Sequence, residues 1–493
     1  MLTQAPVATA VLDAVDGAFV EHHARGAAPS AVWGVFDRQG LVRVGSCGEL
    51  GDGTIPGPDT AYRIASCTKS FTATAVLALR DAGELNLDEP ITRFVPDFSS
   101  VVLPSDDAPT PTIRMLLTMS AGLPTDDPWA DRLEGISTDD LDSILRRGLS
   151  FESVPGTRFA YSNLGYALLG RVIEQAGGRP YRELVRELIL EPLGLTGTGF
   201  DSSVAAGCGV ANGNSWRGGR WHTLPFSLPG AFSPIGGLFS TITDLSRWAR
   251  WLAEAFDLSA SDQGQAPLSR ASRREMQQAQ RFVPNLTQHP TGYGFGLFVE
   301  HYLRGHTVIS HSGGYPGFSS HLRWSSTSGL GVVAFENASY SRVSVPATEA
   351  FDLLNGSLLP NTPHVWAATR SAQAAVTALI REWSDGAAGR LFADNVPLDE
   401  SFVRRRRSIA RALTEIGGLD PVSVPTLAQH RAATAHSNAA TTAIGREEQS
   451  TGPAHLVWYL PGRAGRLRVE ILLNPENPPR VQTLKVSPDR VIV

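Results

Sequence analysis

Hydrophobic and polar positions change their pattern several times along the chain. Short apolar runs bounded by glycine, serine, asparagine or charged residues are typical of β-strands. Such runs gather at two places far apart in the sequence, and the first two are expected to form a hairpin. The expected strands cover residues 31–36, 41–44, 295–300, 307–311, 319–324 and 330–336.

Between these two groups of strands the pattern is helical and is interrupted by proline and glycine. Helices are expected at residues 164–176 and 238–256, and a further one at residues 11–24. The simplest architecture is one antiparallel sheet assembled from both ends of residues 1–358, with helices on its faces and a helical insertion. This predicts an α/β fold of the α+β type.

The composition changes near residue 358, where proline and asparagine indicate a linker at residues 359–364. Residues 365–493 are expected to form a small α+β domain, similar to cystatin-like or NTF2-like folds. Because it holds no constellation of chemical groups, we expect a covering or oligomerising domain. Its expected helices cover residues 366–383 and 402–416, its strands cover 455–460, 467–473 and 481–486, and a polar Ala/Thr-rich segment covers 432–452.

The composition is that of a globular protein and excludes a disordered or fibrous chain. The 493 residues are 42% hydrophobic and 18% charged, with a net charge of −5. This weakly acidic balance argues against nucleic acid as a partner. The run Arg404–Arg407 is then interpreted as a solvated helix face rather than a nucleic-acid patch.

Several absences point to a cytoplasmic protein without cofactor, metal or membrane span. The three cysteines show no disulfide framework and no metal-ligand spacing. The longest uncharged stretch, residues 221–243, is broken by prolines, and the N-terminus lacks the basic start of a secretory signal.

Ser66 and Lys69 form the first segment whose side chains could take part in catalysis. They precede an apolar helical run, and a spacing of three places both side chains on one helix face. The helix dipole favours an alkoxide and a neutral amine there, which suits a serine nucleophile with a lysine base. The competing interpretation is a helix-capping serine and a solvated lysine. The chain contains only two lysines, Lys69 and Lys485, which makes a chance pair uncommon.

Tyr161-x-Asn163 is the second segment and opens the helix expected at residues 164–176. A tyrosine there can exchange protons if a nearby cation lowers its pKa, and the asparagine amide can bind a substrate carbonyl. The competing interpretation is a buried tyrosine beside a capping asparagine.

The third segment, His311-Ser312-Gly313-Gly314, ends one expected strand and precedes another. Glycines on a strand edge let a substrate backbone approach closely, and the Gly314 N–H can pair with that of Ser66 as an oxyanion hole. The competing interpretation is a glycine-rich hairpin with a structural histidine.

Together and in this order, the three segments resemble the penicillin-recognising serine hydrolases. Those enzymes carry S-x-x-K, a second S-D-N-type motif and K-T-G. Here Tyr161-x-Asn163 and His311-x-Gly313 take the second and third places, the pattern of the branch with class C β-lactamases, D-aminopeptidases, DD-peptidases and esterases. The resemblance covers about residues 8–358 and implies a β-lactamase/transpeptidase-like fold.

The resemblance also implies a role for each motif residue. Ser66 would be the acylated nucleophile, Lys69 and Tyr161 would share the acid–base work, and Asn163 would bind substrate. His311, with Gly313 and Gly314, would line the substrate site in place of K-T-G.

The histidine at position 311 replaces a permanent cation with a group that titrates near neutrality. Weak or no β-lactamase activity is therefore expected, and esters or amides, including D-amino-acid peptides, are the expected substrates. An acyltransferase or peptide cyclase on the same fold, and a catalytically silent binding protein, remain as alternatives. The chain lacks G-x-S-x-G, H-E-x-x-H and P-loop lysine motifs, which weakens other hydrolase classes.

Overall fold

The computed structural model contains two compact units, residues Met1–Ser357 and Leu358–Val493. Each is described by itself. The linker predicted at residues 359–364 and most of the predicted Ala/Thr-rich segment lie outside the described residues. The structure describes residues 7–205, 209–257, 267–284, 289–302, 306–357, 365–420 and 448–489.

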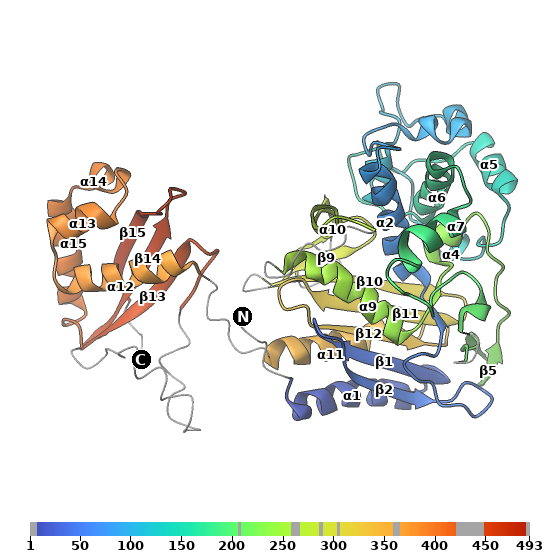
Figure 1. Ribbon diagram of the computed structural model, residues 1–493, viewed down its shortest axis with the longest axis horizontal. Helices are drawn as coiled ribbons and strands as arrows, with labels where there is room; N and C mark the ends of the chain where they lie inside the picture. Colours follow the sequence, from blue (N-terminus) through green and yellow to red (C-terminus); the bar gives the residue numbers. More distant parts are fainter. Residues whose placement is uncertain are drawn as a thin grey trace. The chain divides into compact units, whose positions relative to one another are not determined.

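The first unit is built on an eight-stranded antiparallel sheet with the order β2-β1-β12-β11-β10-β9-β8-β7 (Figure 1). The N-terminal strand β1 pairs with β12, the last strand of the unit, in the register Val32 to Phe335. The prediction of one sheet assembled from both ends of the region is therefore confirmed. The strands are β1 (Ser30–Phe36), β2 (Leu41–Gly48), β7 (Arg281–Phe282), β8 (Thr291–Tyr293), β9 (Phe298–His301), β10 (Thr307–Tyr315), β11 (Phe318–Ser325) and β12 (Gly331–Glu336).

Helices cover both faces of this sheet (Figure 1), which explains why β1 and β12 are apolar without alternation. Trp33 stacks on Phe19 of α1 (Thr9–Ala24) with 4.7 Å between the ring centroids. Its neighbour Gly34 faces Ile242 on the opposite side, where a Cβ atom would lie 2.5 Å from the isoleucine. α1 contacts α11 (Ser344–Ser357) on the first face, while α9 (Ile242–Ala253) contacts the second.

The helical insertion packs around α2 (Thr68–Asp81), which is buried on nearly all sides. The helix predicted at residues 238–256 starts later than expected, because Phe239 and Ser240 form strand β6 and Thr241 caps α9. The other elements are α3 (Ile113–Leu117), α4 (Asp127–Ala130), α5 (Thr138–Arg146), α6 (Asn163–Gly177), α7 (Tyr181–Val185), α8 (Ser233–Gly236), α10 (Arg270–Met276), β3 (Tyr62–Arg63), β4 (Asn214–Arg217), β5 (Arg220–Thr223) and β6 (Phe239–Ser240).

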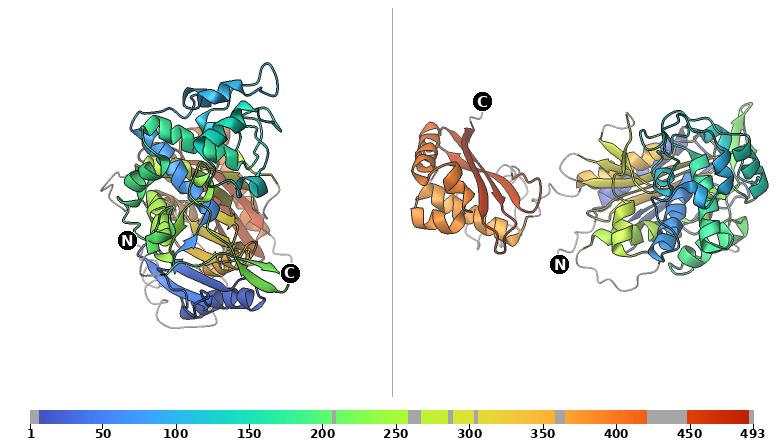
Figure 2. Two further views of the ribbon diagram at one scale, coloured as in Figure 1. Left: turned by 90° about the vertical axis from the view of Figure 1, so that its right-hand side faces the viewer. Right: turned by 90° about the horizontal axis from the view of Figure 1, so that it is seen from above.

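The second unit has its own apolar core between a three-stranded antiparallel sheet and helices on one of its faces (Figures 1 and 2). Two short helices occur in addition to the two expected ones. The elements are α12 (Ala367–Arg381), α13 (Asp385–Leu391), α14 (Asn395–Asp399), α15 (Phe402–Glu415), β13 (His455–Gly462), β14 (Gly465–Leu473) and β15 (Val481–Asp489). Throughout the described part of the chain, every helix is too short or too polar to cross a membrane.

Candidate active site

Ser66 and Lys69 lie within hydrogen-bond distance of each other at the start of α2. Ser66 is the middle residue of a 3-10 turn, Ala65–Cys67, that leads directly into the helix. The Lys69 Nζ atom donates to Ser66 Oγ at 2.9 Å and to the carbonyl oxygen of Ile235, also at 2.9 Å. The lysine is fully buried. The arrangement provides an amine positioned to take the serine proton.

Burial sets the charge state of Lys69, and three aspartates oppose its effect. Desolvation lowers the pKa of the Lys69 ammonium from its ordinary value to about 8, while the negative charges of Asp127, Asp131 and Asp126 raise it. Burial also raises the pKa of the Asp131 carboxyl to about 7, against the pull of the Lys69 charge. A minor fraction of Lys69 is therefore neutral at pH 7, and this fraction grows as the pH approaches 8.

The aspartates were missed by the sequence interpretation, and two of them hold the Tyr161-x-Asn163 segment. Asp126 accepts hydrogen bonds from the backbone N–H groups of Asn163 (2.7 Å) and Leu164 (2.8 Å), which caps α6. Asp127 accepts one from Asn163 Nδ2 at 2.6 Å. The Asn163 Oδ1 atom is buried without a partner among the described residues, so it remains able to accept a hydrogen bond. Adjacent acidic residues before Pro128 were the available signal, and they are typical of a helix start.

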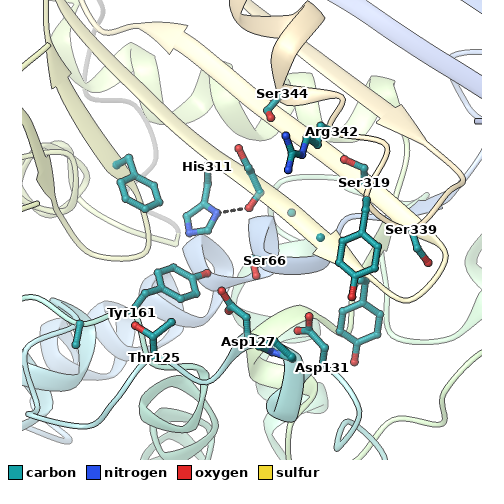
Figure 3. A pocket seen from close by; sticks show the side chains of 18 of the residues that line it. Ser66, Thr125, Asp127, Asp131, Tyr161, His311, Ser319, Ser339, Arg342 and Ser344 are labelled. Atoms are coloured by element: carbon teal, nitrogen blue, oxygen red, sulfur yellow. Dashed lines mark hydrogen bonds between the residues drawn. The ribbon is translucent and has the colours of Figure 1, made fainter. Parts of the chain in front are cut away.

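Tyr161 projects toward Ser66 (Figure 3) and lies over Lys69, whose Nζ is 5.0 Å from the ring centroid. Burial and the negative charge of Asp127 raise the pKa of the Tyr161 phenol well above its ordinary value, although a hydrogen bond with Ser66 acts in the opposite direction. The condition set for proton exchange, that a nearby cation lowers this pKa, is therefore not met. Tyr161 is a neutral phenol, which suits it to donate a proton rather than to accept one.

His311 is neutral, and its hydrogen bonds fix its tautomer. Its Nδ1 atom lies 2.6 Å from the Ser312 carbonyl oxygen, which can only accept, so Nδ1 carries the proton (Figure 3). The Nε2 atom then accepts from the Tyr293 hydroxyl at 3.2 Å. Burial and the charge of Lys69 lower the pKa of His311 to about 3. The expectation that this residue titrates near neutrality is wrong, because no carboxylate among the described residues offsets its burial.

Gly313 and Gly314 have different surroundings. A Cβ atom on Gly313 would lie 2.4 Å from the Ile64 carbonyl oxygen and 2.9 Å from Ala65 Cβ, so this glycine lets β10 approach the turn that carries Ser66. Ala65 itself has a left-handed backbone (φ 46°), which is strained for a residue with a side chain. A Cβ atom on Gly314 would meet nothing within 4 Å. Only Gly314 therefore presents open backbone to a substrate.

A buried ionic cluster joins the helical insertion to the sheet beside the site. Both terminal guanidinium nitrogens of Arg63 on β3, Nη1 and Nη2, donate to Glu134, the latter at 2.8 Å, and the Tyr315 hydroxyl at the end of β10 donates to the same carboxylate at 2.8 Å. Arg63 is 1% exposed and lies between the rings of Phe239 and Tyr315. The cluster fixes the segment after α4 relative to β10.

Ser66 opens into a cavity of about 690 Å³. Acidic Asp127 and Asp131 lie on the α4 side of Ser66, and Arg342 lies toward the start of α11 (Figure 3). The aromatic side chains of its lining are Phe159, Tyr161, Phe298, Tyr315 and Tyr340, whereas Trp129, Trp216, Trp221 and Phe226 are not part of it. Of the predicted site residues, the cavity lining includes Ser66, Tyr161, His311, Gly313 and Gly314, while Lys69 and Asn163 lie behind it.

Comparison with known proteins assigns the family of this chain and its fold. Residues 15–355 match the beta-lactamase family, and the chain therefore belongs to that family. The predicted family and β-lactamase/transpeptidase-like fold are confirmed. Membership of this family of serine hydrolases supports a hydrolase.

The individual relatives share less than a third of their aligned residues with this chain. The chain is 31% identical over 224 residues to beta-lactamase-like protein 2 of Dictyostelium discoideum, covering 43% of this chain and 40% of that protein. It is 28% identical over 295 residues to protein flp of Staphylococcus aureus, covering 57% and 53% respectively. The matches thus span about half of these relatives or less.

Solved structures show the same fold. The octameric penicillin-binding protein homologue from Pyrococcus abyssi aligns with a TM-score of 0.61 at 22% identity, covering 94% of this chain and 91% of that one. A D-stereospecific amidohydrolase from a Streptomyces species aligns with a TM-score of 0.55 at 27% identity, covering 69% and 97%.

Proposed function

We propose that this protein is a serine hydrolase that forms an acyl-enzyme on Ser66 from esters or amides, with D-amino-acid derivatives among the candidates. The observation that carries this proposal is the 2.9 Å contact between Lys69 Nζ and Ser66 Oγ. Burial lowers the lysine pKa to about 8, and the serine opens into a cavity. A serine hydroxyl needs such a neighbouring base to become a nucleophile.

In the first half of the reaction, neutral Lys69 takes the proton from Ser66 as Oγ attacks the substrate carbonyl carbon. The Ser66 and Gly314 N–H groups stabilise the resulting oxyanion. Tyr161, a neutral phenol near Ser66, delivers a proton to the departing oxygen or nitrogen, and Lys69 returns its proton to Tyr161. The products are the Ser66 ester and a neutral alcohol or amine.

In the second half, water attacks the Ser66 ester and loses its proton to Lys69. The carboxylic acid leaves and Ser66 Oγ regains the proton. An amine in place of water would give acyl transfer instead. Neutral His311 offers no cation at the place of the K-T-G lysine, which supports weak or no β-lactam hydrolysis, and the cations of this cavity are instead the guanidinium groups of Arg132 and Arg342.

The decisive experiment treats the protein with a fluorophosphonate probe and a p-nitrophenyl ester. We expect one adduct on Ser66, and loss of both adduct and turnover in Ser66→Ala. Ser339→Ala is the matched control, because Ser339 lines the same cavity but serves Gly317 as a hydrogen-bond acceptor. Ligand binding without any Ser66 adduct would instead indicate a catalytically silent binding protein.

We propose that the second unit has a separate role, in covering the site or in assembly. It has its own core, and the homologue from Pyrococcus abyssi that aligns over 94% of this chain is octameric. Light scattering on the full chain and on residues 1–357 tests assembly. Equal oligomeric states in both would contradict a role in assembly.

A further inference from the structure

A second cavity, of about 1110 Å³, adjoins the cavity that contains Ser66. It lies against α11 and strands β8, β9, β10 and β11. Phe298, Ser312 and Ser344 line both cavities. A substrate bound at Ser66 can therefore extend past Ser312 into the second cavity, and the reaction described above uses none of that space.

The inner wall of the second cavity carries an unpartnered polar group. Ser312 and His321 are directly opposite across the β10–β11 pair, and Ser312 Oγ lies 2.9 Å from His321 Nδ1. His321 is only 3% exposed, and its Nε2 atom has no hydrogen-bond partner among the described residues. A buried nitrogen is costly to leave without a partner, so a ligand is expected to supply one.

The charge on the cavity wall indicates which kind of ligand it takes. Three carboxylates line it, from Glu300, Glu349 and Asp352, and one guanidinium, from Arg323. Arg323 pairs with Glu300 at 2.7 Å in a buried ion pair. Asp352 accepts only a neutral hydrogen bond from Tyr302, and no ion pair between described residues includes Glu349 or Asp352. The two carboxylates on α11 therefore give this end of the groove a net negative charge.

We propose that the second cavity binds a cationic arm of the substrate, such as a chain ending in an ammonium group. This inference rests on the proposed function at Ser66. An ammonium offers donors both to the α11 carboxylates and to His321 Nε2, in the tautomer whose Nδ1–H donates to Ser312. No group of three potential metal ligands converges among the described residues, which favours an extended organic cation over a metal ion.

The test uses pairs of p-nitrophenyl esters that differ only in charge. One member of each pair ends in a primary ammonium group (–CH2–NH3⁺) and the other in the isosteric ethyl group (–CH2–CH3). A matched series of aryl esters carries the same two groups on the leaving alcohol. We expect kcat/KM to be about two- to fivefold higher for the cationic member in at least one series, the order expected of contacts with the solvent-exposed carboxylates of Glu349 and Asp352.

The double variant Glu349→Gln/Asp352→Asn should bring that ratio close to one. The control Asp139→Asn/Glu183→Gln removes the same net charge from exposed positions outside the groove and should keep the ratio. A ratio near one in both series of the unmodified protein would overturn the proposal that the second cavity binds a cationic arm. A ratio that Glu349→Gln/Asp352→Asn leaves unchanged would overturn it too. Turnover that survives Ser66→Ala would instead overturn the proposed function.

Discussion

Two buried bases near Ser66 differ in their electrostatic surroundings. Lys69 lies on α2 near three aspartates from the segment around α4, whereas His311 lies on β10 with a tyrosine hydroxyl and a backbone carbonyl as its partners. Burial lowers the pKa of both residues, to about 8 for Lys69 and about 3 for His311. Neighbouring carboxylates therefore keep the pKa of Lys69 close to neutral pH. His311 has no such neighbours among the described residues, so its ring stays neutral at and around neutral pH.

The largest expected effect comes from making Lys69 unable to lose its proton. Lys69→Arg keeps the positive charge, but a guanidinium does not deprotonate in proteins. We expect kcat for a p-nitrophenyl ester to fall by about 10²–10⁴-fold, the usual contribution of a general base. Lys485→Arg on β15 of the second unit is the control and should leave kcat unchanged. Substantial activity in Lys69→Arg would remove this residue from the mechanism.

The next largest effect is a difference in stability between alanine substitutions of the two glycines of β10. Gly313→Ala places a methyl group against Ile64 and Ala65, and we expect it to lower the free energy of unfolding by about 1–3 kcal/mol, as overpacking does. Gly314→Ala points into open space and should change that free energy by less than about 0.5 kcal/mol. Chemical denaturation measures both values, and equal destabilisation would contradict the assigned packing role.

A smaller effect concerns the pH dependence of the reaction. Because neutral Lys69 is the reactive form, kcat/KM should rise with pH up to about 8. Asp127→Asn keeps an oxygen for Asn163 and removes a negative charge that favours the ammonium, so the lysine pKa should fall. We expect the acid limb to move toward lower pH by up to about one unit. Asp107→Asn in an exposed loop is the control, and an unmoved limb in Asp127→Asn would contradict the electrostatic account.

The last prediction is that the protonation state of His311 does not change with pH. Burial keeps its pKa at about 3, so the ring should stay neutral with the proton on Nδ1 from pH 5 to pH 8. Nitrogen NMR of the histidine side chains reports the tautomer, and His311→Gln assigns the signal. A titration of this signal between pH 6 and pH 7 would show that the surroundings of Lys69 and His311 differ less than the structure indicates.

Contacts made within one helical turn were predictable from the sequence. The spacing of Ser66 and Lys69 determines their contact because both belong to the same short segment. The strands of the large sheet were also predictable, since β1 and β12 are short apolar runs that helices cover on both faces. The order of the motifs then indicated which segments meet around the serine.

Properties that arise only when distant segments pack were not predictable. The hydrogen bond from Tyr293 to His311, and the low pKa that burial gives the histidine, depend on several elements closing around one ring. The aspartates near Lys69 look in the sequence like an ordinary helix start. The need for glycine at position 313 comes from a turn that lies about 250 residues earlier in the chain.

The Arg63–Glu134–Tyr315 cluster has a consequence for the motion of the site. Removing one partner of a buried, hydrogen-bonded charge pair costs about 3–5 kcal/mol, far above thermal energy. The segment after α4 and the end of β10 are therefore expected to move as one body, so the site is assembled before any substrate arrives. Folding, rather than substrate binding, then supplies the free energy that organises the groups around Ser66.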